Sequence, residues 1–251
     1  MIHAPVEDCA RSTWRYRSSA ATHRGAVRAL NEDNYVHRPD LGLWAVADGA
    51  GGHQAGDVAS RIIADKLKAV PAGLDAVELL TEVRLQLARA HDALWIEAAR
   101  RGRHAMLVST IVVLLVRNGH YACLWAGDSR AYLLRGWRLR QLTRDHSLVQ
   151  ELFDAGSISA AEAEHHPAAN VITRAVGAEG LELEKVTDRL YRGDRFLLCS
   201  DGVFKSLPEH ILAEVLATDH DDTAERLLAA ALDRQAGDNI TAVTVEVLGD
   251  G

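Results

Sequence analysis

The stretch Val46-Ala47-Asp48-Gly49-Ala50-Gly51-Gly52-His53 decides how the rest of the sequence is interpreted. An apolar run from residue 43 to residue 47 ends at Asp48, and a glycine-rich turn follows. The pattern predicts a buried strand that delivers one carboxylate to its exposed end, where glycines let the backbone turn sharply and approach a ligand. Asp-Gly is also an ordinary turn sequence, so this stretch alone leaves both interpretations open.

The same combination of an apolar run and an acid recurs three times. Asp201-Gly202 ends the run at residues 196–200, Gly127-Asp128-Ser129 follows a third run, and Gly237-Asp238-Asn239 precedes a fourth. Four acidic strand ends suggest carboxylates that converge on cations. Oxygen-only ligands favour magnesium, manganese or calcium over zinc. Two such ions can stabilise in-line displacement at phosphorus.

One arginine lies close to acids in the early part of the chain. Arg28 precedes Glu32 and Asp33 by four and five residues in a polar turn. A guanidinium fork can bind two oxygens of a phosphate. It can equally form a salt bridge within the turn, so the sequence leaves both roles open.

Composition excludes several classes of protein. The chain has 251 residues, 48% of them hydrophobic, which suffices for a sizeable core. The net charge of -7 argues against nucleic acid as a partner. The three cysteines include no close pair, which predicts free thiols in a reducing compartment. The apolar stretch at 107–116 is too short to span a bilayer. We therefore expect a cytoplasmic protein without a membrane span.

Hydrophobic periodicity predicts strands and helices in alternating groups. Strands are expected at 13–22, 35–37, 43–47, 108–116, 120–126, 131–134, 137–142, 181–190, 194–200 and 240–247. Helices are expected at 56–70, 75–101, 145–154, 159–164, 208–216 and 222–233. The strands fall into two groups separated by a helix pair, and a second helix pair precedes the last strand. This order favours one α+β domain of two sheets with helices outside them.

Taken in order, these segments resemble the metal-dependent serine/threonine protein phosphatases of type 2C, in their bacterial form. The resemblance runs from about residue 22 to residue 245. Its marks are Gly25-x-Val27-Arg28-x-x-Asn31-Glu32-Asp33, Val46-Ala47-Asp48-Gly49-x-Gly51-Gly52-His53, Ala126-Gly127-Asp128-Ser129-Arg130, Leu142-Thr143-x-Asp145-His146-Ser147, Ile172-Thr173-Arg174-Ala175-Val176-Gly177, Leu198-Cys199-Ser200-Asp201-Gly202 and Gly237-Asp238-Asn239-Ile240-Thr241. Each motif alone is weak, but seven in the family's order are not expected by chance.

The resemblance implies a fold and a division into parts. The fold would be a four-layer α-β-β-α sandwich, in which helix pairs flank two antiparallel sheets and metals lie in a cleft at one edge. Residues 1–12 would be a flexible leader, and residues 13–251 would be a single catalytic domain. Residues 146–170 match the mobile flap that shapes access to the cleft.

The resemblance also assigns roles by position. Asp48 would bridge two metals, and either Glu32 or Asp33 would hold the second one directly or through water. Asp128 with Asp201 matches a third, weaker metal site. The implied metal ligands are Glu32, Asp33, Asp48, the carbonyl of Gly49, Asp128, Asp201 and Asp238. The implied catalytic residues are Arg28, Asp48 and Asp201, and the implied substrate-binding residues are Arg28 and Asn239.

The implied activity is hydrolysis of phosphoserine and phosphothreonine on proteins by a hydroxide that bridges two metals. Two or three manganese or magnesium ions would be needed. Phosphoproteins would be the substrates, and a cognate serine/threonine kinase and its targets would be the partners of an expected monomer. Two departures stand out: animal members carry a histidine where this chain has Ala50, and Val108 replaces a usual glycine. His53 lies three residues further on and is at most a substitute for that histidine; the competing and favoured interpretation is a residue that packs or caps at the start of a helix.

Two alternatives compete with this function. One is a catalytically silent relative that binds phosphoproteins or a regulatory partner, which the complete set of acids argues against. The other is an acidic calcium-binding module. The chain contains no Asp-x-Asp-x-Asp-Gly loop, which argues against the second alternative.

Overall fold

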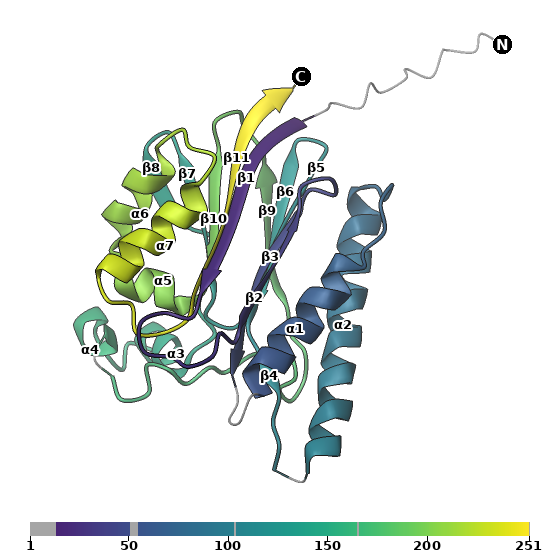
Figure 1. Cartoon of the computed structure of the whole chain (residues 1–251), viewed down its shortest axis with the longest axis vertical. Helices are drawn as coiled ribbons and strands as arrows, with labels where there is room; N and C mark the ends of the chain where they lie inside the picture. The colour runs from purple at the N-terminus through teal and green to yellow at the C-terminus, as the bar shows by residue number, and fades with distance from the viewer. Residues whose placement is uncertain (1–13, 51–54, 103, 165, 251) are drawn as a thin grey trace, which may run out of the picture.

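The computed structural model describes residues 14–50, 55–102, 104–164 and 166–250. The expected leader at 1–12 and the histidine at position 53 lie outside these residues. The described strands form two antiparallel sheets that face each other, with helices on both outer faces (Figure 1). This confirms the expected layers.

The first sheet has the strand order β1-β11-β10-β7-β8. Its strands are β1 (Trp14–His23), β11 (Ile240–Asp250), β10 (Arg195–Cys199), β7 (Arg130–Arg135) and β8 (Arg138–Gln141). The second sheet has the order β2-β3-β5-β6-β9, and a short strand, β4, pairs with β3. Its strands are β2 (Asp33–Arg38), β3 (Leu43–Ala50), β4 (Val108–Ser109), β5 (Ile111–Arg117), β6 (His120–Ala126) and β9 (Glu184–Arg189).

Helices cover the outer face of each sheet. The second sheet is covered by α1 (Ala55–Lys68) and α2 (Ala76–Arg101), and the first by α5 (Asp201–Ser206), α6 (Glu209–Leu216) and α7 (Thr223–Asp233) (Figure 1). Two short helices, α3 (Leu148–Asp154) and α4 (Ala160–Glu164), lie near one end of the first sheet. No helix in the described part of the chain is both long and apolar enough to cross a membrane.

The central strands are apolar on both faces because each face packs against another layer. In β3, Trp44 and Val46 belong to the core between the sheets, whereas Leu43, Ala45 and Ala47 pack toward α1 and α2. A third core lies between the first sheet and its helices. This double burial explains why the runs that precede the acids read as continuous apolar stretches rather than as alternating ones.

The structure corrects three details of the sequence prediction. Asp201-Gly202 is the first turn of α5, which was not expected, rather than a simple turn after β10. The strands also do not divide between the sheets in sequence order, because β1 pairs with β11 and β9 pairs with β6. Finally, β9 starts at Glu184 and α3 at Leu148, each three residues later than predicted.

Candidate metal centre

Two acids face each other across the pair of strands β2 and β3. Asp33, the first residue of β2, lies opposite Asp48 in the antiparallel register. Asp33 is buried, and its Oδ2 accepts a hydrogen bond from the Ser200 hydroxyl at 2.7 Å. Ser200 lies between β10 of the other sheet and α5, so this bond connects the two sheets at the position of Asp33. The Oδ1 of Asp33 is buried and has no hydrogen-bond partner.

The strand end that carries Asp48 is held by hydroxyl groups. Its backbone N–H donates to Thr110 Oγ1 at 3.2 Å, and its carbonyl accepts from the Thr110 N–H at 2.8 Å. The hydroxyls of Thr110 and Ser129 lie 2.7 Å apart. Ser129 directly follows Asp128, so the ends of β3 and β6 are tied together next to their two acids.

Asp201 and Asp238 are brought together by a close approach of two backbone segments. A Cβ added to Gly202 would lie 2.1 Å from the carbonyl oxygen of Asn239. Only a glycine therefore lets the start of α5 pack against the residues that precede β11. This contact places the acid before Gly202 and the acid before Asn239 at the same edge of the sandwich.

Gly56 is a second glycine whose missing side chain matters for the site, because two candidate ligand oxygens lie close to it. A Cβ on Gly56, in the first turn of α1, would lie 2.6 Å from the carbonyl oxygen of Gly49 and 2.7 Å from Glu32 Oε1. The Gly49 carbonyl and the Glu32 carboxylate thus both lie against Gly56, where any side chain would push them away. Asp33, in contrast, is directed toward Asp48 and Ser200.

The turn that carries Arg28 is fastened by Asn239. The amide nitrogen of Asn239 donates to the carbonyls of Arg24 and Leu30, both at 2.9 Å, and its Oδ1 accepts from the Glu32 N–H at 2.8 Å. Asn239 is buried and orients this turn. Its contact with substrate stays a prediction.

Arg28 itself is half-exposed, and its Nη2 donates to Asp238 Oδ2 at 2.9 Å. Arg28 therefore does form a salt bridge, one of the two roles that the sequence left open. Its partner is Asp238, which precedes β11, and not Glu32 or Asp33 of its own turn. The bond to Asp238 raises the pKa of the guanidinium, so Arg28 carries a full positive charge at the mouth of the acidic cluster.

The acids repel one another and are poorly solvated. Burial raises the pKa of Asp33 to about 7, although hydrogen bonds from Ser200 and Thr241 oppose this shift. Burial, followed by the charge of Asp201, raises the pKa of Asp128 to about 7. Desolvation, followed by the charges of Asp33 and Asp201, raises the pKa of Asp48 well above its usual range. Such a cluster favours the binding of a cation that neutralises it.

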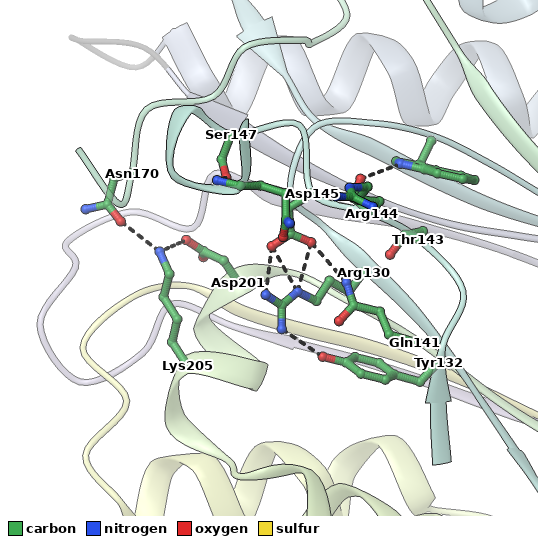
Figure 2. A network of polar contacts seen from close by, with 12 residues as sticks. Arg130, Tyr132, Gln141, Thr143, Arg144, Asp145, Ser147, Asn170, Asp201 and Lys205 are labelled. Atoms are coloured by element: carbon green, nitrogen blue, oxygen red, sulfur yellow. Dashed lines mark hydrogen bonds and ion pairs between the residues drawn. The ribbon is translucent and has the colours of Figure 1, made fainter. Parts of the chain in front are cut away.

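Two basic side chains of the protein already contact this cluster. Besides the Arg28–Asp238 pair, Lys205 Nζ lies 2.6 Å from Asp201 Oδ2 and 2.8 Å from Asn170 Oδ1 (Figure 2). Among the residues that the structure describes, no group of three or more aspartate, glutamate, histidine or cysteine side chains is arranged so that it could already hold a metal ion. Arg28 is bonded to Oδ2 of Asp238 and Lys205 to Oδ2 of Asp201, so a metal on either of these oxygens would have to displace the basic group bonded to it, whereas a metal on Oδ1 of Asp201 would not displace Lys205.

The residues nevertheless fit a hard divalent cation. The available donors are carboxylate and carbonyl oxygens, and Asp33 and Asp128 each present a buried Oδ1 without a hydrogen-bond partner. Divalent magnesium, manganese and calcium prefer such oxygen donors. The half-exposed Arg28 beside the acids adds a group that can bind phosphate oxygens.

A buried ion pair anchors the segment that leads into α3. Arg130 donates to both carboxylate oxygens of Asp145 at 2.7–3.1 Å (Figure 2). Its guanidinium also stacks on the ring of Phe204 at 3.8 Å. Tyr132 and Gln141 complete the network through bonds to Arg130 and Asp145. The start of the expected flap is thereby fixed to β7 and α5.

Sequence reasoning missed Lys205 and the role of the supporting hydroxyls. Lys205 follows Asp201 by four residues, the spacing at which opposite charges pair on a helix. That signal required α5 to be recognised first. Ser200 stands in one of the seven motifs, but its role, like that of Thr110, depends on contacts between segments distant in sequence.

Comparison with known proteins gives consistent results. A family model described as protein phosphatase 2C matches residues 21–239. The serine/threonine phosphatase stp of Listeria monocytogenes is 36% identical over 235 residues, which cover 90% of this chain and 93% of that protein.

Solved structures show the same similarity. PppA of Pseudomonas aeruginosa, described as a key regulatory component of T6SS, superposes with a TM-score of 0.85 at 43% identity and covers 93% of this chain and 98% of that one. The catalytic domain of the serine/threonine phosphatase PstP, in complex with two manganese ions, gives a TM-score of 0.82 at 32% identity, with 94% and 100% of the two chains covered.

Proposed function

The chain belongs to the protein phosphatase 2C family and is a metal-dependent serine/threonine protein phosphatase, and from this premise we propose how its own residues carry the reaction. The observation that supports the proposal most strongly is the convergence of acids from both sheets on one edge of the sandwich, with Arg28 beside them. No observation favours the catalytically silent alternative. Residues 13–251 would form the single catalytic domain.

Asp48 is the shared ligand of two divalent cations in this proposal. Asp201 and Asp238 complete the first ion, because the close approach at Gly202 brings their segments together. The Gly49 carbonyl and Glu32 would hold the second ion, since both oxygens lie against Gly56, whose missing side chain lets them approach each other. Asp33, which lies opposite Asp48 and has a buried Oδ1 without a hydrogen-bond partner, would be the alternative to Glu32 as a holder of this ion. The ions, when bound, supply Lewis acidity toward phosphate oxygens and lower the pKa of water.

Arg28 binds the phosphate of the substrate. Its guanidinium is half-exposed and reaches Asp238 at the edge of the cluster, so a short side-chain movement exchanges a carboxylate for a phosphate oxygen. Asn239 holds the turn of Arg28 in place through three backbone groups. Substrate binding and metal binding are thus coupled through Asp238, which contacts the arginine and ligates the first ion.

The biological setting follows from the family and the composition. Phosphoserine and phosphothreonine proteins are the substrates, and a cognate serine/threonine kinase and its targets are the partners. Manganese is the expected ion, with magnesium as the alternative, because PstP binds two manganese ions. The buried free thiols Cys123 and Cys199 support a reducing, cytoplasmic setting, and a monomer is expected.

The activity is tested with p-nitrophenyl phosphate and with a phosphothreonine peptide. We expect the chelated protein to be inactive and manganese to restore turnover on both substrates. Asp48→Asn should remove turnover, while Asp40→Asn, which alters an exposed acid paired with Arg38, should leave it intact. Full turnover by the chelated protein would contradict the metal-dependent mechanism.

A further inference from the structure

Lys205 lies at the junction of the acidic cluster and the segment between α4 and β9. It projects from the last turn of α5, where its Nζ contacts Asp201 on one side and Asn170 on the other (Figure 2). Asn170 belongs to the segment expected to act as the flap. One ammonium group therefore joins a candidate metal ligand to the candidate flap.

The charge of Lys205 acts on both acids of the expected outer metal site. Its charge interacts with Asp201 and Asp128, and these two acids also repel each other. Asp128 has a buried Oδ1 without a hydrogen-bond partner. The charge of Lys205 opposes the rise in the pKa of Asp128 that burial and the charge of Asp201 cause. Lys205, Asp128 and Asn170 line the same cavity of about 750 Å³.

We propose that Lys205 is a positioning residue whose ammonium supplies Asp201 and Asp128 with positive charge that an outer divalent cation would otherwise supply. Through its bond to Asn170, Lys205 also couples this charge to the flap. The inference rests on the proposed function, because it presumes the two tightly held ions. An ammonium and a divalent cation that both contacted Asp201 would repel each other strongly in a poorly solvated site. Lys205 and an outer cation therefore compete for Asp201.

The proposal has two consequences. First, the outer ion binds weakly in the native protein, because it must displace an ammonium that is already hydrogen-bonded. Second, displacement of Lys205 by an outer ion releases Asn170, so high metal concentration loosens the flap. A lysine that only packed on the helix surface would produce neither effect.

The test is a calorimetric manganese titration of the full chain together with hydrogen exchange of residues 147–173. Lys205→Met keeps an unbranched side chain, one atom shorter than lysine, and removes the charge. We expect this variant to bind the weaker ion at least tenfold more tightly, to keep the affinity of the tight pair within about twofold, and to lose exchange protection in the flap.

Three control variants separate the two halves of the proposal. Lys205→Arg, which retains a positive charge, should restore weak outer-ion binding. Asn170→Ala should lose flap protection and tighten the outer ion by much less than Lys205→Met does, because it removes one bond to Lys205 and leaves the charge in place. In Lys205→Met with Asp128→Asn, the gain in outer-ion affinity should disappear.

Each outcome decides a different point. If Lys205→Met leaves the affinity of every ion unchanged, or if Lys205→Arg behaves like Lys205→Met, the charge role of Lys205 is wrong while the phosphatase mechanism stands. If Lys205→Met keeps flap protection, the coupling to Asn170 is wrong. If the native protein binds no divalent cation, the proposed metal centre and this inference both fail.

Discussion

Arg28 has two candidate partners at the residue scale, a carboxylate and a phosphate, and the structure shows the first of them. Because its pair with Asp238 is half-exposed, the pair itself contributes little to stability. The guanidinium is therefore available to a phosphate group, whose oxygens accept stronger, charge-assisted hydrogen bonds.

Replacement of this arginine should affect substrate more than metal. We expect Arg28→Ala to lower kcat/KM by roughly 10- to 150-fold, which corresponds to the loss of about 1.5–3 kcal/mol from a charge-assisted hydrogen bond. Manganese affinity should not fall. Steady-state kinetics and metal titration measure the two effects, and Arg38→Ala, another arginine paired with a carboxylate, is the matched control with native values. Unchanged kinetics in Arg28→Ala would leave Arg28 as a salt bridge only.

Gly202 is the second decisive position at this scale, because its missing side chain allows α5 to approach β11. Gly202→Ala places a Cβ 2.1 Å from the Asn239 carbonyl, so we expect a loss of about 1–3 kcal/mol in the free energy of unfolding, as for an overpacked site. The shift should also separate Asp201 from Asp238 and weaken metal binding. Denaturant titration and calorimetry measure both effects.

Gly237→Ala is the matched control for this change. A Cβ there meets only Val27 at an ordinary distance of 3.6 Å, although the residue lies next to Asp238. Its stability should stay close to native. Equal losses in both variants would mean that the close approach at Gly202 does not determine the site.

At the scale of elements, the segment that leads into α3 depends on one buried ion pair. Asp145 is nearly fully buried, and both of its carboxylate oxygens accept from Arg130. Asp145→Ala would leave the guanidinium without its partner. We expect this to cost about 3 kcal/mol in the free energy of unfolding, since removal of one member of a buried pair leaves an uncompensated charge.

The comparison variant is Arg144→Ala. Arg144 directly precedes Asp145 in the chain, and its replacement breaks an exposed ion pair with Asp154. Exposed pairs contribute little, so its unfolding curve should overlay that of the native protein. Urea denaturation with both variants checks the prediction. If Asp145→Ala unfolds at the native midpoint, the Arg130 network does not anchor this segment.

The elements also show where prediction from sequence succeeds and where it stops. The strands before Asp48 and Asp201 were predictable because double burial makes them continuous apolar runs that end at an acid. The helix α5 was missed because its Asp-Gly start is a common turn sequence and glycine is a poor helix former.

Pairings between distant segments were not predictable. The bond between Ser200 and Asp33 and the pairing of β1 with β11 join parts of the chain that share no local pattern. The family resemblance supplied the fold, which the structure confirms, and the ligand set, which stays a prediction. The contacts through which Thr110 holds the end of β3 in place had to be seen in three dimensions.

At the scale of the whole molecule, the proposed metal ligands come from both sheets. Asp48 and Glu32 belong to the layer of β2 and β3, whereas Asp201 and Asp238 adjoin β10 and β11. Bound ions would therefore join the two sheets at one edge and relieve repulsion within the cluster. Metal binding and global stability should be linked.

This linkage predicts a measurable thermal shift. Manganese at 100 times its dissociation constant should stabilise the native state by about 2.7 kcal/mol per independent site, and a chelator should remove the gain. Differential scanning calorimetry with and without manganese measures the effect. A native protein whose Tm does not respond to manganese would argue against ions that join the sheets.

The central claim is that Asp48 is the ligand shared by two tightly bound ions, whereas Asp128 serves only an outer one. Calorimetric manganese titration of Asp48→Asn and Asp128→Asn, combined with assays of phosphopeptide hydrolysis, tests it most directly. We predict that Asp48→Asn loses both tight ions and all turnover, while Asp128→Asn keeps the tight pair and turns over more slowly. If Asp128→Asn loses the tight ions and Asp48→Asn keeps them, the arrangement of the site is the reverse of the one described.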